Sequence, residues 1–277
     1  MTGIVVALIL SAALMHASWN AILHSDSDRL WSMVLMCMVS AACALPFALW
    51  LPAPARASWP YIAASASVQI VYCLFLIRAY RDSELSQIYP IARGSAPFMV
   101  ALGAALFAHE RLGMISLIGV ACVGGGVISL ARGKDRAHPT AVAIAFATGM
   151  MIAGYTLIDG IGARTSMNSY AYTAWLFVCQ GAPMPVIYML VRGRMRVPLN
   201  RETLLTAFGG LISALGYGAV ILAMTLTPMG AVAALREVSI LFAVAIGRIF
   251  LKERLSLARI VAGVLIAGGA TCLAMGR

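Results

Sequence analysis

The chain is divided into ten apolar stretches of about 20 residues each by short segments rich in charged and turn-forming residues. Because an α-helix rises about 1.5 Å per residue, such a stretch crosses the roughly 30 Å hydrocarbon core of a bilayer. Hydrophobic residues make up 62% of the chain and charged residues 11%, whereas globular domains average about 45–50% and about 25%. The sequence therefore predicts an all-α integral membrane protein with ten transmembrane helices. They are expected at residues 4–23, 30–50, 59–79, 85–107, 113–131, 139–163, 169–191, 203–226, 229–250 and 257–275.

Lysine and arginine are distributed unequally between the connecting loops. Loops that follow odd-numbered stretches hold 11 of these residues, whereas the other loops together with the C-terminus hold 4. Basic residues concentrate in cytoplasmic loops of multi-pass proteins. Both termini are therefore expected on the non-cytoplasmic side of a bacterial-type inner or plasma membrane.

The two halves of the sequence repeat each other at a constant offset. Residues 91–126 align without a gap on residues 234–269, so that Arg93 meets Arg236 and Glu110 meets Glu253, each 143 residues later. The pattern predicts a duplication into two five-helix repeats, residues 4–131 and 139–275, within one structural domain. Because each repeat has an odd number of helices, the second repeat must be inverted in the membrane. Inverted repeats around a central cavity near the bilayer midplane are typical of secondary transporters.

Several of these features resemble a known superfamily. The sequence resembles the EamA-type families of drug/metabolite transporters in three features. These are ten apolar stretches arranged as five plus five, the tripeptide "ERL" at 110–112 and 253–255, and a glycine-rich stretch after each tripeptide. The resemblance covers the full chain as two EamA-like repeats and implies a membrane carrier, many relatives being exporters of amino acids and other metabolites. The segment "HASWNAILHSDSDR" at 16–29 also resembles a subset linked to phosphonate metabolism. The small multidrug transporters of this superfamily carry a proton-binding glutamate in the first helix; residues 4–23 contain no acidic residue, so a cationic-drug/proton antiporter is not expected.

Two arginines interrupt apolar stretches at equivalent positions of the repeats. An arginine at the bilayer centre costs about 2.5–3.5 kcal/mol on insertion scales, so it normally faces a cavity or a partner. Arg93 shares a helix face with Tyr89, and we expect it to line the cavity or to meet a structural partner. Arg236 is followed by Glu237, but adjacent helical residues do not face each other. Either Glu237 reaches a cation on another helix while Arg236 faces the cavity, or both residues have structural partners. The sequence favours Arg93 as the arginine that lines the cavity and Arg236–Glu237 as a structural pair.

Other polar and aromatic residues recur at helical spacing on stretches that line the cavity in this family. In addition to Arg93, Tyr89 and Arg236, the substrate-binding candidates are His16, Trp19, Asn20, Gln69, Tyr72, Tyr155 and Tyr217. The alternative role for each of them is an interhelical hydrogen bond.

Four acidic residues are candidates for structural or coupling roles: Glu237, Asp159, Glu110 and Glu253. Glu110 and Glu253 follow apolar stretches, so they are expected near the N-terminus of the next helix, where a negative charge is favourable. Asp159 is four residues after Tyr155 and either joins the cavity wall or lies at the membrane interface.

The sequence contains no pattern typical of a catalytic or metal site. The four histidines are scattered, and neither H-E-x-x-H nor G-x-S-x-G occurs, so no enzymatic activity is expected. The six cysteines lie in apolar runs without a C-x-x-C pair, and a packing role is predicted. No cofactor, metal or nucleic acid is expected; the partners are the lipid bilayer and a small solute, and a monomer is compatible with the sequence.

The function predicted from these features is secondary transport by alternating access, most simply export, of a small metabolite such as an amino acid or another carboxylate or anionic organic solute. The alternatives are a non-transporting membrane receptor or scaffold, and a carrier of a phosphonate-type or uncharged solute.

Overall fold

The computed structural model describes residues 1–25, 28–79, 85–130, 139–195, 200–250 and 257–276. Within these ranges the regular structure is helical: α1 (Gly3–Ser25), α2 (Arg29–Trp50), the short 3₁₀ helix η1 (Arg56–Ser58), α3 (Trp59–Ala79), α4 (Leu85–Phe107), α5 (Met114–Ser129), α6 (Pro139–Thr165), α7 (Ser169–Gly181), α8 (Met184–Arg192), α9 (Arg201–Leu226), α10 (Met229–Arg236), α11 (Ser239–Phe250) and α12 (Leu257–Met275). Each of the ten predicted stretches is helical, but two of them are each divided into two helices. The expectation of ten continuous helices was therefore wrong at these two places.

The first division separates α7 from α8 and has a simple chemical cause. Pro183 follows the C-cap residue Ala182, and proline has no backbone N–H to continue a helical ladder. Elsewhere, side chains fix where helices begin. Asn168 and Asn200 each accept a hydrogen bond from the backbone N–H three residues later, at 3.1 and 2.8 Å, which satisfies a donor that the first helical turn leaves open.

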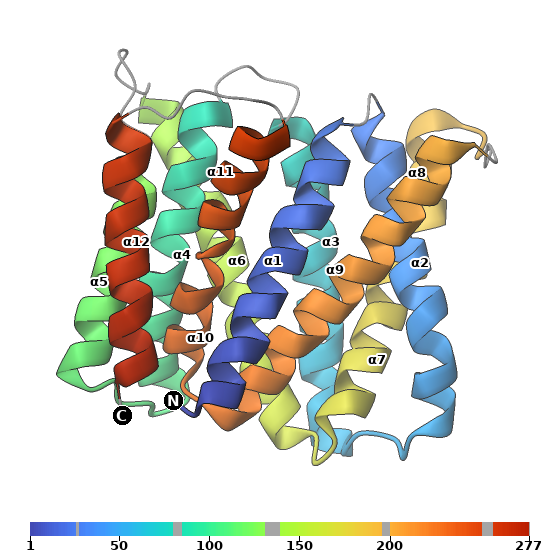
Figure 1. Ribbon diagram of the computed structural model, residues 1–277. Helices are drawn as coiled ribbons and strands as arrows, with labels where there is room; N and C mark the ends of the chain where they lie inside the picture. Colours follow the sequence, from blue (N-terminus) through green and yellow to red (C-terminus); the bar gives the residue numbers. More distant parts are fainter. Residues whose placement is uncertain (26–27, 80–84, 131–138, 196–199, 251–256, 277) are drawn as a thin grey trace.

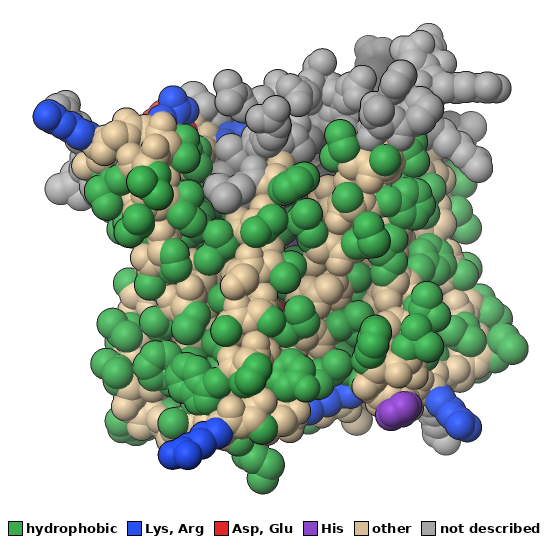
Figure 2. All heavy atoms as spheres, turned by 180° about the vertical axis from the view of Figure 1, so that it is seen from behind, with side chains coloured by type: hydrophobic (Ala, Val, Ile, Leu, Met, Phe, Trp, Pro, Cys, Tyr) green, Lys and Arg blue, Asp and Glu red, His purple; other side chains and the backbone are tan. Residues whose placement is uncertain are grey.

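Five helical segments are long and apolar enough to cross a membrane: Gly3–Leu23, Arg29–Trp50, Val142–Thr165, Ser169–Arg192 and Arg201–Leu226. Shorter apolar helices cover Ile91–Phe107, Met114–Ser129 and Ile260–Met275. Figure 2 shows hydrophobic side chains over the middle of the molecule, with lysine and arginine toward the two ends. This distribution fits a multi-pass membrane protein whose sides contact lipid; ten crossings remain a prediction.

Both ends of the chain lie at the same end of the helical bundle (Figure 1). The ammonium group of Met1 donates a hydrogen bond to the carbonyl oxygen of Gly276 at 3.0 Å. An even number of crossings would place the termini together in this way.

Glycines allow helices from the two halves of the chain to pack closely. A Cβ atom at Gly210 of α9 would lie 2.7 Å from the carbonyl oxygen of Met36 on α2, and one at Gly269 of α12 would lie 2.7 Å from that of Gly119 on α5. Both distances are shorter than a normal van der Waals contact, so only glycine fits without movement. These contacts hold α2 against α9 and α5 against α12.

The interior of the bundle is built around α10. Every residue from Met229 to Arg236 is buried, and α10 contacts α1, α4, α5, α6 and α9. Its C-terminal end therefore lies inside the protein rather than at a surface.

Candidate functional site

The second helix division lies between α10 and α11, at Glu237 and Val238. The backbone N–H groups of Glu237 and Val238 donate to Ala234 and Leu235, each three residues earlier, at 3.0 and 3.2 Å. Bonds of this spacing form a tightened 3₁₀ turn. The turn lies directly after Arg236 and includes Glu237, so it falls at two adjacent charged residues of a mostly apolar segment.

Glu237 forms an ion pair with an arginine from the other half of the chain. Its Oε2 lies 2.9 Å from Nε of Arg93 on α4, and its Oε1 lies 3.8 Å from Nη2 of Arg236. The Glu237 side chain is 0% exposed and the arginine side chains 2% and 4%. One carboxylate thus faces two guanidinium groups, which leaves this cluster with an excess of one positive charge.

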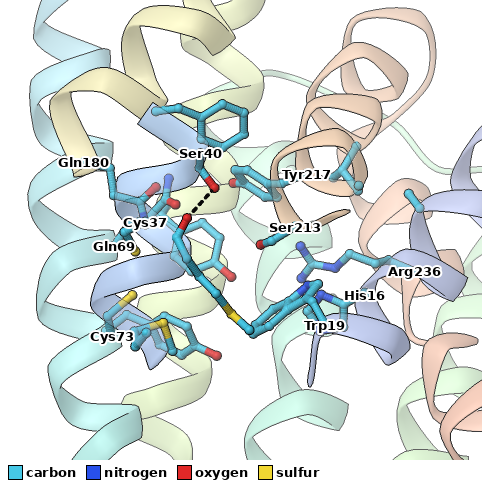
Figure 3. Close-up of a pocket in the computed structure, with 18 residues that line it drawn as sticks. His16, Trp19, Cys37, Ser40, Gln69, Cys73, Gln180, Ser213, Tyr217 and Arg236 are labelled. Atoms are coloured by element: carbon cyan, nitrogen blue, oxygen red, sulfur yellow. Dashed lines mark hydrogen bonds between the residues drawn. The ribbon is translucent and has the colours of Figure 1, made fainter. Parts of the chain in front are cut away.

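A cavity of about 100 Å³ adjoins this cluster. It is enclosed by α1, α2, α3, α6, α7, α9 and the end of α10 (Figure 3). Arg236 extends into the cavity on the side of His16, and within the described part of the chain its Nε and the Nε2 of His16 are buried without a hydrogen-bond partner. The cavity therefore has one unsatisfied guanidinium donor at this side, beside an imidazole nitrogen that can donate or accept according to its tautomer.

Aromatic side chains form another part of the cavity wall. Tyr155 lies between Tyr72 and Tyr217, with ring centroids 5.7 and 5.9 Å away, and Tyr217 contacts Phe177 at 6.4 Å. The ring of His16 meets Trp19 edge-on at 5.0 Å. Such rings provide apolar faces and, in the tyrosines, hydroxyl groups.

Asp159 lies behind this wall and is 0% exposed. Its Oδ2 accepts hydrogen bonds from the Tyr217 hydroxyl at 2.5 Å and from Gln69 Nε2 at 3.1 Å, and its Oδ1 accepts one from the Tyr172 hydroxyl at 3.0 Å. Tyr217 and Gln69 also line the cavity. The carboxyl group is thus separated from the cavity by a single side chain.

A second charged cluster lies at the end of the bundle that holds the termini. Glu110 forms an ion pair with Arg164 at 2.6 Å and accepts a hydrogen bond from the backbone N–H of Met229 at 2.8 Å. Arg164 also donates to the carbonyl oxygens of Met224 and Thr227 at 2.8 and 3.1 Å. These bonds join the segment after α4 to α6, to the end of α9 and to the start of α10.

Comparisons with known proteins agree with this architecture. Residues 139–275, the second half of the chain, match the model of the EamA-like transporter family. The chain belongs to the EamA-like transporter family. A solved structure described only as "Crystal structure of protein" is similar in fold, with a TM-score of 0.79 and 16% identity, over 99% of this chain and 97% of that chain. No curated protein matches the sequence.

The structure of this EamA-like protein brings together most of the residues selected from the sequence. His16, Trp19, Gln69, Tyr72, Tyr155, Tyr217 and Arg236 line one cavity. Asn20 does not; its Nδ2 donates to the carbonyl oxygen of His16 at 3.0 Å. The side chain of Tyr89 and all of Glu253 lie outside what the structure describes.

For Arg93 the sequence left a cavity role and a structural role open, and for Arg236 it favoured the structural role. Arg93 is held by Glu237 and is not among the side chains that line the cavity, whereas Arg236 is. This is the arrangement in which Glu237 reaches a cation on another helix. The sequence did not indicate the turn that follows α10, because no glycine or proline occurs between Gly230 and Gly247.

The acidic residues also differ in part from expectation. Asp159 is fully buried rather than at an interface. Glu110 does serve a helix N-terminus, but that of α10 and not of α5, the next helix.

Several lining residues of this EamA-like protein were not selected from the sequence. Ser40 and Gln180 are polar residues inside apolar stretches, a signal that could have identified them. Cys37 and Cys73 were assigned to packing, yet they line the cavity. No sequence pattern linked Tyr172 or Arg164 to their acidic partners.

Proposed function

We propose that this EamA-like protein is a secondary transporter, acting as an exporter, of a small solute that carries a carboxylate or another anionic group, such as an amino acid. One observation carries the proposal: Arg236 extends into the cavity with an unpaired buried Nε beside His16. Glu237 only partly neutralises Arg236, because the 3.8 Å separation exceeds hydrogen-bond distance and the carboxylate lies closer to Arg93. A solute anion supplies the missing acceptor.

The aromatic part of the wall accepts the remainder of the solute. Trp19, Tyr72, Tyr155, Phe177 and Tyr217 give the cavity apolar and π-rich surfaces opposite a few polar groups. Small-molecule sites commonly have this composition. The cavity volume of about 100 Å³ restricts the occupant to a small metabolite in this conformation.

The transport mechanism that we propose is alternating access between two inverted repeats, residues 4–131 and 139–275. The packing supports this division, because helices related by the 143-residue offset make reciprocal contacts. α1 packs on α9 as its counterpart α6 packs on α3, and α4 packs on α6 as α10 and α11 pack on α1. The cavity lies among helices from both repeats, so a rocking motion of one repeat against the other would change its access.

The Glu110–Arg164 cluster would act as the gate at the end that holds the termini. It connects the first repeat to three helices of the second, and it must break for the repeats to separate there. By the distribution of basic residues, this end faces away from the cytoplasm in a bacterial-type plasma membrane. An exporter would close it while solute enters from the cytoplasm.

The test is thermal stability of the purified, detergent-solubilised protein with amino acids, small carboxylates, phosphonates, sugars, nucleosides and organic cations. A ligand at a hundredfold excess over Kd stabilises the folded state by about 2.7 kcal/mol. Hydrogen bonds to charged groups contribute about 1.5–3 kcal/mol, so Arg236→Gln should weaken binding of an anionic solute about 10- to 100-fold. Arg201→Gln, at an exposed position of α9, is the matched control and should leave binding unchanged.

Other outcomes separate the alternatives. Stabilisation by cations alone, or equal binding of anions by Arg236→Gln, would refute the anion site. Binding without movement of the solute into or out of liposomes would favour a receptor, and a response restricted to phosphonates would identify that class.

A further inference from the structure

Asp159 differs from the other buried acidic residues in its partners. Glu237 and Glu110 each form an ion pair with arginine. Asp159 instead accepts hydrogen bonds from uncharged groups, those of Tyr172, Tyr217 and Gln69, and the side chain of Ser65 also interacts with it. Among the described residues, no lysine, arginine or histidine pairs with it. Burying a carboxylate without a cation is costly, and intramembrane acids of this kind mark proton pathways in transporters.

The hydrogen-bond partners of Asp159 fit both of its charge states. As a carboxylate it accepts from two tyrosine hydroxyls and one amide, as in the structure. As a carboxylic acid it must donate one hydrogen, and a tyrosine hydroxyl can accept it because that group is both donor and acceptor. Tyr217 is the suitable acceptor, since its oxygen lies 2.5 Å from Oδ2.

A change in the charge state of Asp159 would change the hydrogen-bonding state of a side chain that lines the cavity. When a proton from water binds Oδ2, the new O–H donates to the Tyr217 oxygen, and the Tyr217 hydrogen that had been donated to Asp159 becomes free. Tyr217 lines the cavity, so it can then donate that hydrogen to a solute there. When the proton leaves to water, Tyr217 turns back to the carboxylate. One proton is bound and one is released, and no other reactant is required.

Other titratable groups surround Asp159 on the elements packed against α6. Tyr155 lies one turn away on α6 and is subject to the charges of Asp159 and of the arginine cluster. Tyr61 on α3 interacts electrostatically with Tyr172. Arg164, further along α6, forms an ion pair with Glu110. Within the described part of the chain, the other charged and titratable groups of this region are Tyr172, Tyr217, Arg93, Arg236 and Glu237, and Arg56 of η1, which also packs against α6, is exposed.

The internal duplication gives this position a counterpart. Asp159 and His16 are related by the same offset as the two arginines, since 159 − 16 = 143 and 236 − 93 = 143. Each half thus places a titratable group on its first helix, one in the cavity wall and one behind it.

We propose that Asp159 is a proton-binding site whose occupancy is transmitted to the solute cavity through Tyr217, so that solute movement is coupled to the proton. The coupling rests on the proposed transport function, whereas proton binding does not.

The test is infrared difference spectroscopy of the full-length protein in liposomes, between acidic and alkaline buffers and without any solute. The C=O stretching band of a protonated carboxyl should appear reversibly on acidification. It should be lost in Asp159→Asn and kept in Glu202→Gln, which alters an exposed acid at the start of α9. In Tyr217→Phe the band should remain but shift in frequency, because the carboxyl has lost a hydrogen-bond partner.

The same band in Asp159→Asn, or the absence of any pH-sensitive carboxyl band in the unmodified protein, would overturn the proton site. An unshifted band in Tyr217→Phe would overturn the link to the cavity. If Asp159→Asn does not fold, Tyr217→Phe and Tyr172→Phe retain the carboxyl and decide the question by whether the frequency shifts. A failure of the solute panel leaves these spectra valid, so the two proposals can fail separately.

Discussion

Glu237→Gln tests whether one buried carboxylate holds two arginines in place. The substitution preserves the shape of the side chain but leaves Arg93, previously 2.9 Å away and 2% exposed, without its counter-charge. Removing one partner of a buried ion pair costs about 3–5 kcal/mol. Arg236, at 3.8 Å, is too distant for a hydrogen bond and should add little to this value. The expected loss in the free energy of unfolding is therefore about 3–5 kcal/mol.

A double-mutant cycle isolates the interaction itself. Arg93→Gln alone leaves Glu237 only its distant partner, Arg236, whereas Arg93→Gln combined with Glu237→Gln removes both charges of the close pair. The double variant should be less destabilised than the sum of the single variants by about 1–3 kcal/mol. Reversible unfolding of the full-length protein in mixed micelles by increasing sodium dodecyl sulfate measures each value. Additivity within about 0.5 kcal/mol would refute the argument that this pair stabilises the interior.

The matched control is the pair of Arg192 and Asp28, whose atoms lie 3.8 Å apart with side chains 56% and 41% exposed. Asp28→Asn preserves the oxygen that accepts from the backbone N–H of Trp31 at the start of α2. A double-mutant cycle of Asp28→Asn and Arg192→Gln should give a coupling energy below about 1 kcal/mol, because solvent screens exposed charges.

Three further outcomes are expected. Gly210→Ala should destabilise the protein by about 1–3 kcal/mol through overpacking, as measured by the same unfolding assay. The control Gly125→Ala should not destabilise it, because no atom lies within 4 Å of the added Cβ. Equal effects of the two substitutions would contradict the close packing of α2 and α9. Glu110→Gln should raise amide hydrogen exchange at the start of α10 about fivefold, since a partly exposed ion pair contributes about 1 kcal/mol. Mass spectrometry of a peptide that begins several residues before Met229 and includes it measures the exchange, and an unchanged rate would refute the role of the Glu110–Arg164 cluster as a gate. A thiol reagent should label Cys37, which lines the cavity, and a bound solute should slow the labelling; labelling at the same rate would place the solute elsewhere.

The positions of the helical segments could be predicted because their cause is local. Apolar stretches of bilayer length, interrupted by charges, proline and asparagine caps, give helices whatever they pack against. The same is true of the division between α7 and α8, where Pro183 was visible in the sequence although its effect was not anticipated. The 143-residue offset was likewise read directly from matched residues such as Arg93 and Arg236, and the duplication that it indicates stays a prediction.

The partners of the charged side chains could not be predicted. The contact between Glu237 and Arg93 joins helices from opposite halves of the chain, and Asp159 is held by groups from α3, α7 and α9. Neither involves residues at helical spacing, so no periodicity in the sequence reports them.

The sequence by itself determined that this protein is a helical membrane protein of the EamA type, with an arginine in an apolar stretch of each half. Only the tertiary structure decided which arginine faces the cavity. Successive side chains of a helix point about 100° apart, so Arg236 and Glu237, at the end of α10 and in the turn after it, face different neighbours, and packing decides which neighbour each one meets. That turn lies where Glu237 can reach Arg93 on α4, a contact that exists only once the two halves have packed together.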